Sequence, residues 1–139
     1  MTLDFTTDHG KMAREQLENE IVIWLTTVTP KGMPQPNPIW FVWEDDCVIT
    51  WVQPHSARIR NLEHNNQVSL NMVGDPAASH MTVLTGTAEV DESIGSALEN
   101  EQYMKKYAHR WAGTDMTPER AAEEFSLPLR IRPTKLRGF

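Results

Sequence analysis

The sequence predicts a mostly β fold: an antiparallel barrel with helical insertions. Runs of β-branched and aromatic residues recur at short intervals between residues 21 and 90, and another run closes the chain. Most neighbouring runs are joined by short turns rich in Pro, Gly and Asp, as in antiparallel sheets. Helical patterns fill two gaps between the strands instead of alternating with every strand, which disfavours a parallel βαβ sheet. A chain of 139 residues fits one domain spanning residues 1–139.

The N-terminal half is predicted to begin with a short, largely exposed helix over residues 8–20, capped by Asp8. Three strands follow, and short turns between them predict a meander. These strands cover residues 21–29, 35–44 and 47–53. Pro36 and Pro38 have no backbone N–H to donate, so the first half of the second strand is expected at an edge of the sheet.

The second half is predicted to mix helices with strands. Ser56 is expected to cap one or two helical turns between residues 54 and 66. Gly86 is expected to form a bulge or bend in a long strand. Thr117 is expected to cap a helix whose first position is Pro118. The remaining ranges are a strand over 67–73, the long strand over 81–90, a helix over 91–108 and a closing strand over 126–139.

Composition and short motifs argue against several classes of protein. The net charge of −6 disfavours broad nucleic-acid binding, which needs a basic surface. The chain has no run of about 18 apolar residues and no signal-peptide pattern, so we expect a cytoplasmic protein without a membrane partner. Cys47 is the single cysteine and is expected to be an inert, buried thiol. We find no phosphate-binding glycine loop, dinucleotide fingerprint, serine-nucleophile motif or zinc-like histidine spacing.

One short stretch of this acidic chain, HSARIRN, carries the side chains of an anion site. A strand ends here and a short helix begins, so its first turn presents free N–H groups and the positive end of the helix dipole. Arginine can bind phosphate through two parallel hydrogen bonds. The alternative is an exposed basic turn paired with nearby carboxylates. The residues concerned are Ser56, Arg58, Arg60 and Asn61.

Amides and aromatic rings lie upstream of this stretch. Gln35 and Asn37 offer amides, and Trp40 and Trp51 offer flat apolar surfaces. A planar, polar heteroaromatic ring is bound by such a combination. Most of the five tryptophans are still expected to serve core and interface packing.

These motifs resemble a known family. The stretch GMPQPNPIWFVWEDDCVITWVQPHSARIRNLEHNNQVSLNM is similar to the pyridoxamine-phosphate-oxidase-like split β-barrel flavoproteins, and more narrowly to the deazaflavin-dependent B-type flavin/deazaflavin oxidoreductases. The resemblance covers residues 20–90 well, the closing RPTKLRGF is also similar, and residues 92–125 are distinctive of neither.

The resemblance implies an FMN-binding-like split β-barrel that forms a homodimer, with cofactor sites at the interface. Arg58 and Arg60 would bind the cofactor phosphate. Trp51 and Ser56 would lie beside the ribityl chain or the phosphate. The whole implied cofactor-binding set is Gln35, Asn37, Pro38, Trp40, Trp51, Ser56, Arg58, Ile59, Arg60 and Asn61.

The expected function is therefore that of an oxidoreductase in which the cofactor supplies the chemistry and no protein residue is catalytic. The leading hypothesis is hydride transfer from reduced coenzyme F420 to an electron-poor small molecule. One alternative is an FMN-dependent oxidase or reductase of the same family. The other is a non-catalytic protein that binds a cofactor or a haem-type ligand, with His55 or His80 as a haem ligand.

The basic C-terminal strand has two readings. It is either a solvated strand face or a rim that meets an anionic ligand, such as the oligoglutamate of F420. Its cationic residues are Arg130, Arg132, Lys135 and Arg137.

Overall fold

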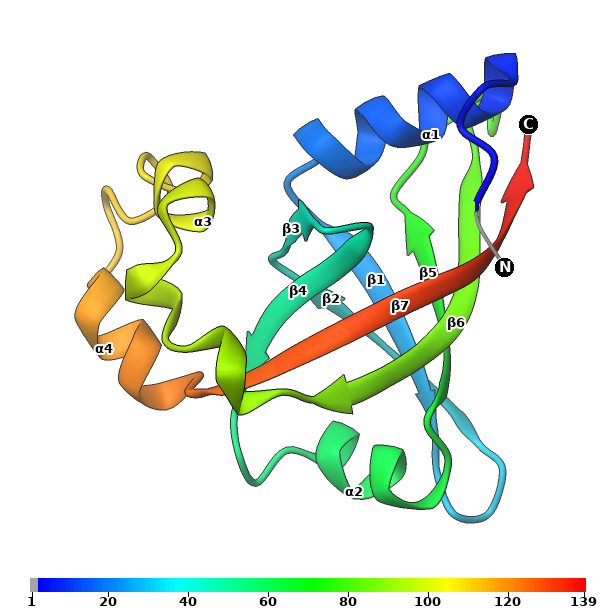
Figure 1. The fold of residues 1–139 in the computed structure, drawn as a ribbon. Coiled ribbons are helices and arrows are strands. Elements are labelled where there is room, and N and C mark those ends of the chain that lie inside the picture. The colour runs from blue at the N-terminus through cyan, green and yellow to red at the C-terminus, as the bar shows by residue number, and fades with distance from the viewer. Residues whose placement is uncertain (1–2) are drawn as a thin grey trace.

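The computed structural model describes residues 3–139. Within them, seven strands form one antiparallel sheet in the order β2-β1-β5-β6-β7-β4-β3. The strands are β1 (Ile23–Val28), β2 (Pro34–Ile39), β3 (Val42–Glu44), β4 (Cys47–Val52), β5 (Gln67–Met72), β6 (Thr82–Val90) and β7 (Leu127–Gly138). The sheet curls into a half-barrel (Figure 1), so the expected split-barrel fold is confirmed.

The helices lie around this sheet in three places (Figure 1). Helix α1 (Asp8–Asn19) crosses one end of the sheet and α2 (Ala57–His64) lies at the opposite end. Helices α3 (Glu101–Lys106) and α4 (Pro118–Glu124) stand together to one side, near β4. Two single 3₁₀ turns, η1 (Glu92–Ile94) and η2 (Ala97–Glu99), connect β6 to α3. None of the helices in residues 3–139 is long and apolar enough to cross a membrane.

The predicted meander of three strands is wrong. Residues 35–44 form two strands, and these lie at opposite edges of the sheet: β2 pairs with β1, while β3 pairs with β4. Only Trp40 and Phe41 separate the two strands in the sequence, so the sheet must curl until its edges meet. The hydroxyl of Tyr107, which follows α3, accepts a hydrogen bond from the Phe41 N–H at 2.9 Å. We call this link of Trp40 and Phe41, where the two edges of the sheet meet, the seam of the barrel. A long-range contact holds the seam, and the local pattern of residues 35–44 did not reveal it.

The single helix predicted over residues 91–108 is also wrong. Gly95 adopts a left-handed backbone conformation with φ of 84°, which interrupts the helix. Asp91, Ser96 and Asn100 then each cap a separate short turn by accepting a hydrogen bond from a backbone N–H two or three residues later. The result is η1, η2 and α3 in succession.

The caps of α1 and α4 follow the expected chemistry, with a change of residue at α1. Thr7, not Asp8, caps α1, and its hydroxyl accepts from the Gly10 N–H. Thr117 caps α4, with Pro118 at its first position, as predicted.

The main core fills the inside of the half-barrel, with Leu25, Phe41 and Leu70 among its buried members. A second apolar cluster lies on the other face of β4 and brings Ile49 and Trp51 against the η2–α4 segment. All six residues of β4 are buried for this reason. The bulge expected at Gly86 is confirmed by a register shift between Thr85 and Gly86, where a Cβ atom would collide with the facing strand β7.

Candidate functional site

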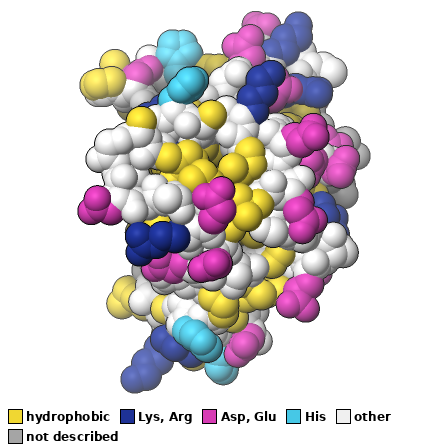
Figure 2. All heavy atoms as spheres, turned by 90° about the vertical axis from the view of Figure 1, so that its left-hand side faces the viewer, with side chains coloured by type: hydrophobic (Ala, Val, Ile, Leu, Met, Phe, Trp, Pro, Cys, Tyr) yellow, Lys and Arg dark blue, Asp and Glu magenta, His cyan; other side chains and the backbone are white. Residues whose placement is uncertain are grey.

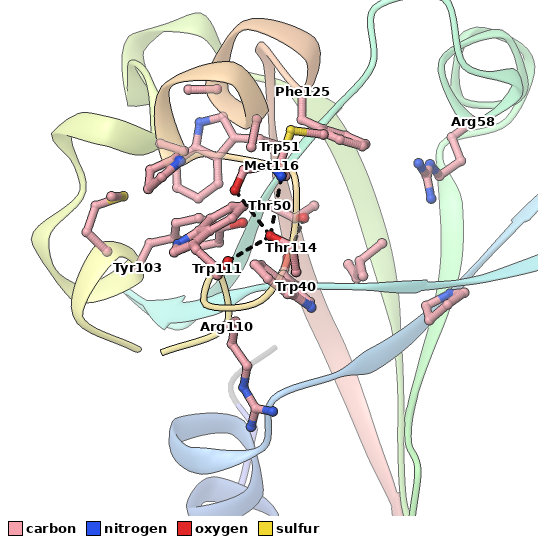
Figure 3. Close-up of a pocket in the computed structure, with 17 residues that line it drawn as sticks. Trp40, Thr50, Trp51, Arg58, Tyr103, Arg110, Trp111, Thr114, Met116 and Phe125 are labelled. Atoms are coloured by element: carbon pink, nitrogen blue, oxygen red, sulfur yellow. Dashed lines mark hydrogen bonds between the residues drawn. The ribbon is translucent and has the colours of Figure 1, made fainter. Parts of the chain in front are cut away.

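A cavity of about 380 Å³ lies between the outer face of β4 and the segment that carries α3 and α4 (Figure 3). This volume is within the range of small-molecule sites. The barrel contributes Pro38, Ile39, Trp40, Thr50 and Trp51 to its lining, and α2 contributes Arg58. The segment after β6 contributes Ala97, Tyr103, Met104, Arg110, Trp111, Thr114, Met116, Pro118, Ala121, Ala122 and Phe125.

Aromatic rings make up much of the cavity wall. Trp40 stacks on Tyr107 with ring centroids 4.4 Å apart, and Trp111 meets Trp40 edge-on at 5.2 Å. Trp51 and Tyr103 pack edge to face at 4.7 Å. Figure 2 shows the corresponding face of the molecule, where hydrophobic side chains gather at the centre and acidic ones lie around them. The cavity is therefore suited to a flat, largely apolar group.

The aromatic wall is held by hydrogen bonds from neighbouring elements. The Trp51 indole N–H donates to the Gly95 carbonyl at 2.8 Å, so the backbone that breaks the predicted helix also fixes this ring. The Thr50 hydroxyl donates to the Trp40 carbonyl at 2.6 Å. The Trp51 ring is therefore fixed by a hydrogen bond, whereas the Trp40 ring is held by its stacking on Tyr107.

Arg58 approaches the cavity from the first turn of α2 (Figure 3). Its Nε atom is buried and has no hydrogen-bond partner in residues 3–139, and no carboxylate of the described chain pairs with its guanidinium. Burial lowers the pKa of Arg58 from its usual value. Arg58 is half-buried, and a partly desolvated cation without a counter-ion is less stable than one in water, which makes this end of the cavity suited to an anion.

Ser56 is at the N-cap of α2, as predicted, but it does not cap the helix with its side chain. Its Oγ atom is buried and makes no hydrogen bond to any described residue. The Nε1 atom of Trp111 is also buried and makes no hydrogen bond to any described residue. Buried polar atoms normally have partners, so these atoms indicate places where a ligand or water can bind.

The structure brings together four of the ten residues predicted for cofactor binding. Pro38, Trp40, Trp51 and Arg58 line the cavity, and Ser56 precedes Arg58 at the start of α2. The other five do not line it: Asn37 and Arg60 are exposed, Ile59 is half-buried, and Gln35 and Asn61 bond to each other.

Sequence reasoning missed the second wall of the cavity. Tyr103, Met104, Trp111, Met116 and Phe125 all come from the segment that matched no motif. Its aromatic and methionine content was the available signal, but such residues more often form a core. Arg110 also borders the cavity, although its guanidinium points away from the aromatic rings in Figure 3.

The basic C-terminal strand is not brought to the cavity. Arg130 pairs with Asp91 at 2.9 Å and Arg132 pairs with Glu89 at 3.1 Å, so two of its cations bind carboxylates of this chain. Lys135 and Arg137 lie toward the C-terminal end of β7, away from α3 and α4 (Figure 1).

The fold agrees with a comparison against protein-family models. The model described as pyridoxamine 5'-phosphate oxidase matches residues 10–135. The chain therefore belongs to this family, as the sequence motifs indicated. The family includes oxidoreductases and binds flavin-type cofactors.

Solved structures are similar over nearly the whole chain. An F420 reductase is 27% identical, with a TM-score of 0.67, and the match covers 89% of this chain and 94% of that one. HutZ, the haem storage protein from Vibrio cholerae, is 19% identical with a TM-score of 0.63 and 92% coverage of both chains. A haem-binding protein from Mycobacterium smegmatis is 21% identical with a TM-score of 0.62, and the match covers 96% of this chain and 54% of that one. At these identities the two haem proteins show only that they share a fold with this chain. A search of curated proteins finds no match.

Proposed function

We propose that this protein binds a flavin-type cofactor between the aromatic cavity and the first turn of α2, and that it is an F420-dependent oxidoreductase. One observation carries the proposal: within the described residues, Arg58 Nε and Ser56 Oγ are both buried without a partner beside an aromatic cavity. A phosphate would accept hydrogen bonds from both groups and would supply the negative counter-charge that no described carboxylate gives Arg58.

The residues present fit such a cofactor in two parts. Arg58, Ser56 and the free N–H groups of the first turn of α2 would hold the phosphate. Trp40 and Trp51 would enclose the ring system, whose flat faces suit the apolar wall. Arg60 would contribute from the exposed side of the same helix, where water weakens its contribution.

A reduced deazaflavin supplies a hydride when it is bound, and the chain's own residues orient it and exclude water. Among residues 3–139, no His, Cys, Asp or Glu side chain lines the cavity. Tyr103 is the titratable phenol there, and burial raises its pKa to about 12, so it stays protonated at neutral pH. The wall thus binds and shields an electron-poor substrate and leaves hydride donation to the cofactor.

The similarity to an F420 reductase favours F420 over FMN as the cofactor. FMN presents a comparable ring and phosphate, so an FMN-dependent reaction is the alternative outcome of the binding test. Haem storage receives less support because His55 and His80 are exposed and do not line the cavity.

We also propose that the protein is a cytoplasmic homodimer in which the partner completes each cofactor site. Strand β2 supports this arrangement: it lies at a sheet edge, and Gln35 and Asn37 remain partly or fully exposed there. Three prolines in β2 prevent regular strand addition, so the partner would pack through side chains. Sedimentation should detect a dimer, and a monomer with full cofactor affinity would contradict the shared site.

The test is fluorescence titration of the purified protein with F420 and with FMN. Arg58→Ala should weaken binding about 10-fold to 150-fold, the equivalent of about 1.5–3 kcal/mol for a charge-assisted hydrogen bond. Arg60→Ala, the matched control on the same helix, should have a smaller effect because Arg60 is exposed. Unchanged affinity in Arg58→Ala would remove the phosphate site, and preference for FMN would replace F420.

A further inference from the structure

Asn61 is a buried polar residue of α2 that does not line the cavity. Its side chain is 3% exposed. The amide nitrogen donates one hydrogen bond to Thr27 Oγ1 at 2.9 Å and another to Gln35 Oε1 at 2.8 Å. Both amide hydrogens are therefore used, and both bonds leave the helix.

The two acceptors belong to neighbouring strands. Thr27 on β1 and Gln35 on β2 are direct partners in the antiparallel ladder. One amide of α2 thus spans the β1–β2 hairpin, and β2 continues to Pro38 at the cavity. Asn61 connects the helix that carries Arg58 with the strand that forms part of the aromatic wall.

An apolar contact also attaches α2 to the barrel. Leu62 packs against the main core. An apolar contact holds the helix close to the barrel but is not directional, whereas a hydrogen bond depends steeply on angle. The two bonds of Asn61 therefore set the rotation of α2 about its axis. Asn61 follows Arg58 by three residues, within one helical turn, so this rotation also sets the direction of the Arg58 side chain.

We infer that Asn61 is a positioning residue for the proposed cofactor phosphate. It orients Arg58 and the first turn of α2 by bonding Thr27 and Gln35, and it does not contact the ligand. This inference rests on the proposed function, because it concerns the same phosphate site.

The test measures the contribution of the phosphate to binding, which a general loss of stability does not change selectively. FMN and riboflavin differ by the phosphate alone, whereas F420 differs from its deazaflavin core by the phosphate and by the oligoglutamate attached through it. For the pair that the wild-type protein binds more tightly, the dissociation constant of the phosphate-free ligand divided by that of the phosphorylated ligand reports this contribution. For the F420 pair, the part of the ratio that Arg58→Ala removes is taken as the phosphate contribution. Asn61→Ala should reduce this ratio by about ten-fold, the equivalent of one hydrogen bond to a charged group.

A double-mutant cycle then identifies the route of the effect. In an Arg58→Ala background, Asn61→Ala should cause a smaller further loss in the ratio than in the wild-type background, because the Arg58 side chain is absent and only the first turn of α2 is left to be positioned. Thr27→Val removes one acceptor from the barrel side and should produce a smaller loss in the same direction, which tests the inference if Asn61→Ala fails to fold. Asn66→Ala is the control: this exposed amide makes no side-chain hydrogen bond to any described residue, and its loss should leave the ratio unchanged.

Three results would overturn the inference. One is an unchanged ratio in both Asn61→Ala and Thr27→Val while the wild-type protein shows a strong phosphate preference. Another is an equal loss of affinity for the phosphate-free ligand, which would indicate a general structural role. A wild-type protein with no phosphate preference would overturn the proposed function as well, and that outcome is visible before any variant is made.

Discussion

Replacing Tyr107 with Phe should lower the free energy of unfolding by removing a hydrogen bond at the seam of the barrel. Tyr107 is fully buried, and its hydroxyl accepts from the Phe41 N–H and donates to the Ile21 carbonyl at 2.7 Å. The bond from Phe41 holds one of the two residues, Trp40 and Phe41, that link β2 to β3 at opposite edges of the sheet. The bond to Ile21 ties this link to the residue two positions before β1. The substitution removes a single oxygen atom and keeps the ring that stacks on Trp40.

The expected cost follows from the groups left without a partner. The Phe41 N–H would be buried and unpaired, which costs about 1–3 kcal/mol. Ile21 is only partly buried, so water can replace the lost donor at its carbonyl. The Phe41 carbonyl keeps the Lys106 amine at 2.9 Å. A total of about 1–3 kcal/mol corresponds to a fall in Tm of roughly 3–12 °C for a domain of this size.

Urea denaturation followed by tryptophan fluorescence measures the free energy of unfolding. Tyr103→Phe is the matched control, because the Tyr103 hydroxyl makes no hydrogen bond to residues 3–139 although the ring is largely buried. It should change stability by less than about 0.5 kcal/mol. Equal effects of the two substitutions, or a loss below about 0.5 kcal/mol in Tyr107→Phe, would refute the assignment of the seam to this hydroxyl.

Three further predictions concern titratable groups. Burial lowers the pKa of Lys106 to about 8 from its usual 10.5. Between these two values the unfolded chain binds more protons than the folded protein, so the free energy of unfolding should rise with pH. Lys106→Met should flatten this rise when urea midpoints are measured across the range. The Ser93 hydroxyl and Arg130 lower the pKa of Asp91 to about 2, so its stabilising effect should be lost as pH falls from 3.8 to 2, and acid unfolding of Asp91→Asn should lack this component. Buried Cys47 should react with a disulfide reagent only at the rate of unfolding, and rapid labelling of the native protein would contradict its burial.

Several features of the site were predictable because they depend on neighbouring residues. The start of α2, with Ser56 at its cap position and Arg58 in its first turn, follows from local helix signals. Trp40 and Trp51 were expected near a ring site, and both line the cavity. The bulge at Gly86 also follows from a local signal, because glycine within a strand pattern marks close backbone approach.

Other features depend on residues far apart in the sequence. Gln35 and Asn61 were expected to bind the cofactor, and in the structure the Asn61 amide nitrogen donates to Gln35 Oε1 across 26 positions. The sequence could not reveal this bond, because it depends on the packing of α2 against the β1–β2 hairpin. Arg130 and Arg132 were open to a ligand role until the fold placed Asp91 and Glu89 beside them.

The sequence by itself determined the secondary structure of most strands, the family and the cation at the start of α2, because hydrophobic pattern, turn chemistry and capping act over a few residues. Tertiary structure alone decided where the sheet closes and what faces Trp40 and Trp51. The Tyr107 hydroxyl reaches Phe41 across 66 positions, and the second cavity wall comes from a segment with no motif of its own. Such contacts form only when chain segments with little local preference are brought together by burial of the barrel and of both faces of β4.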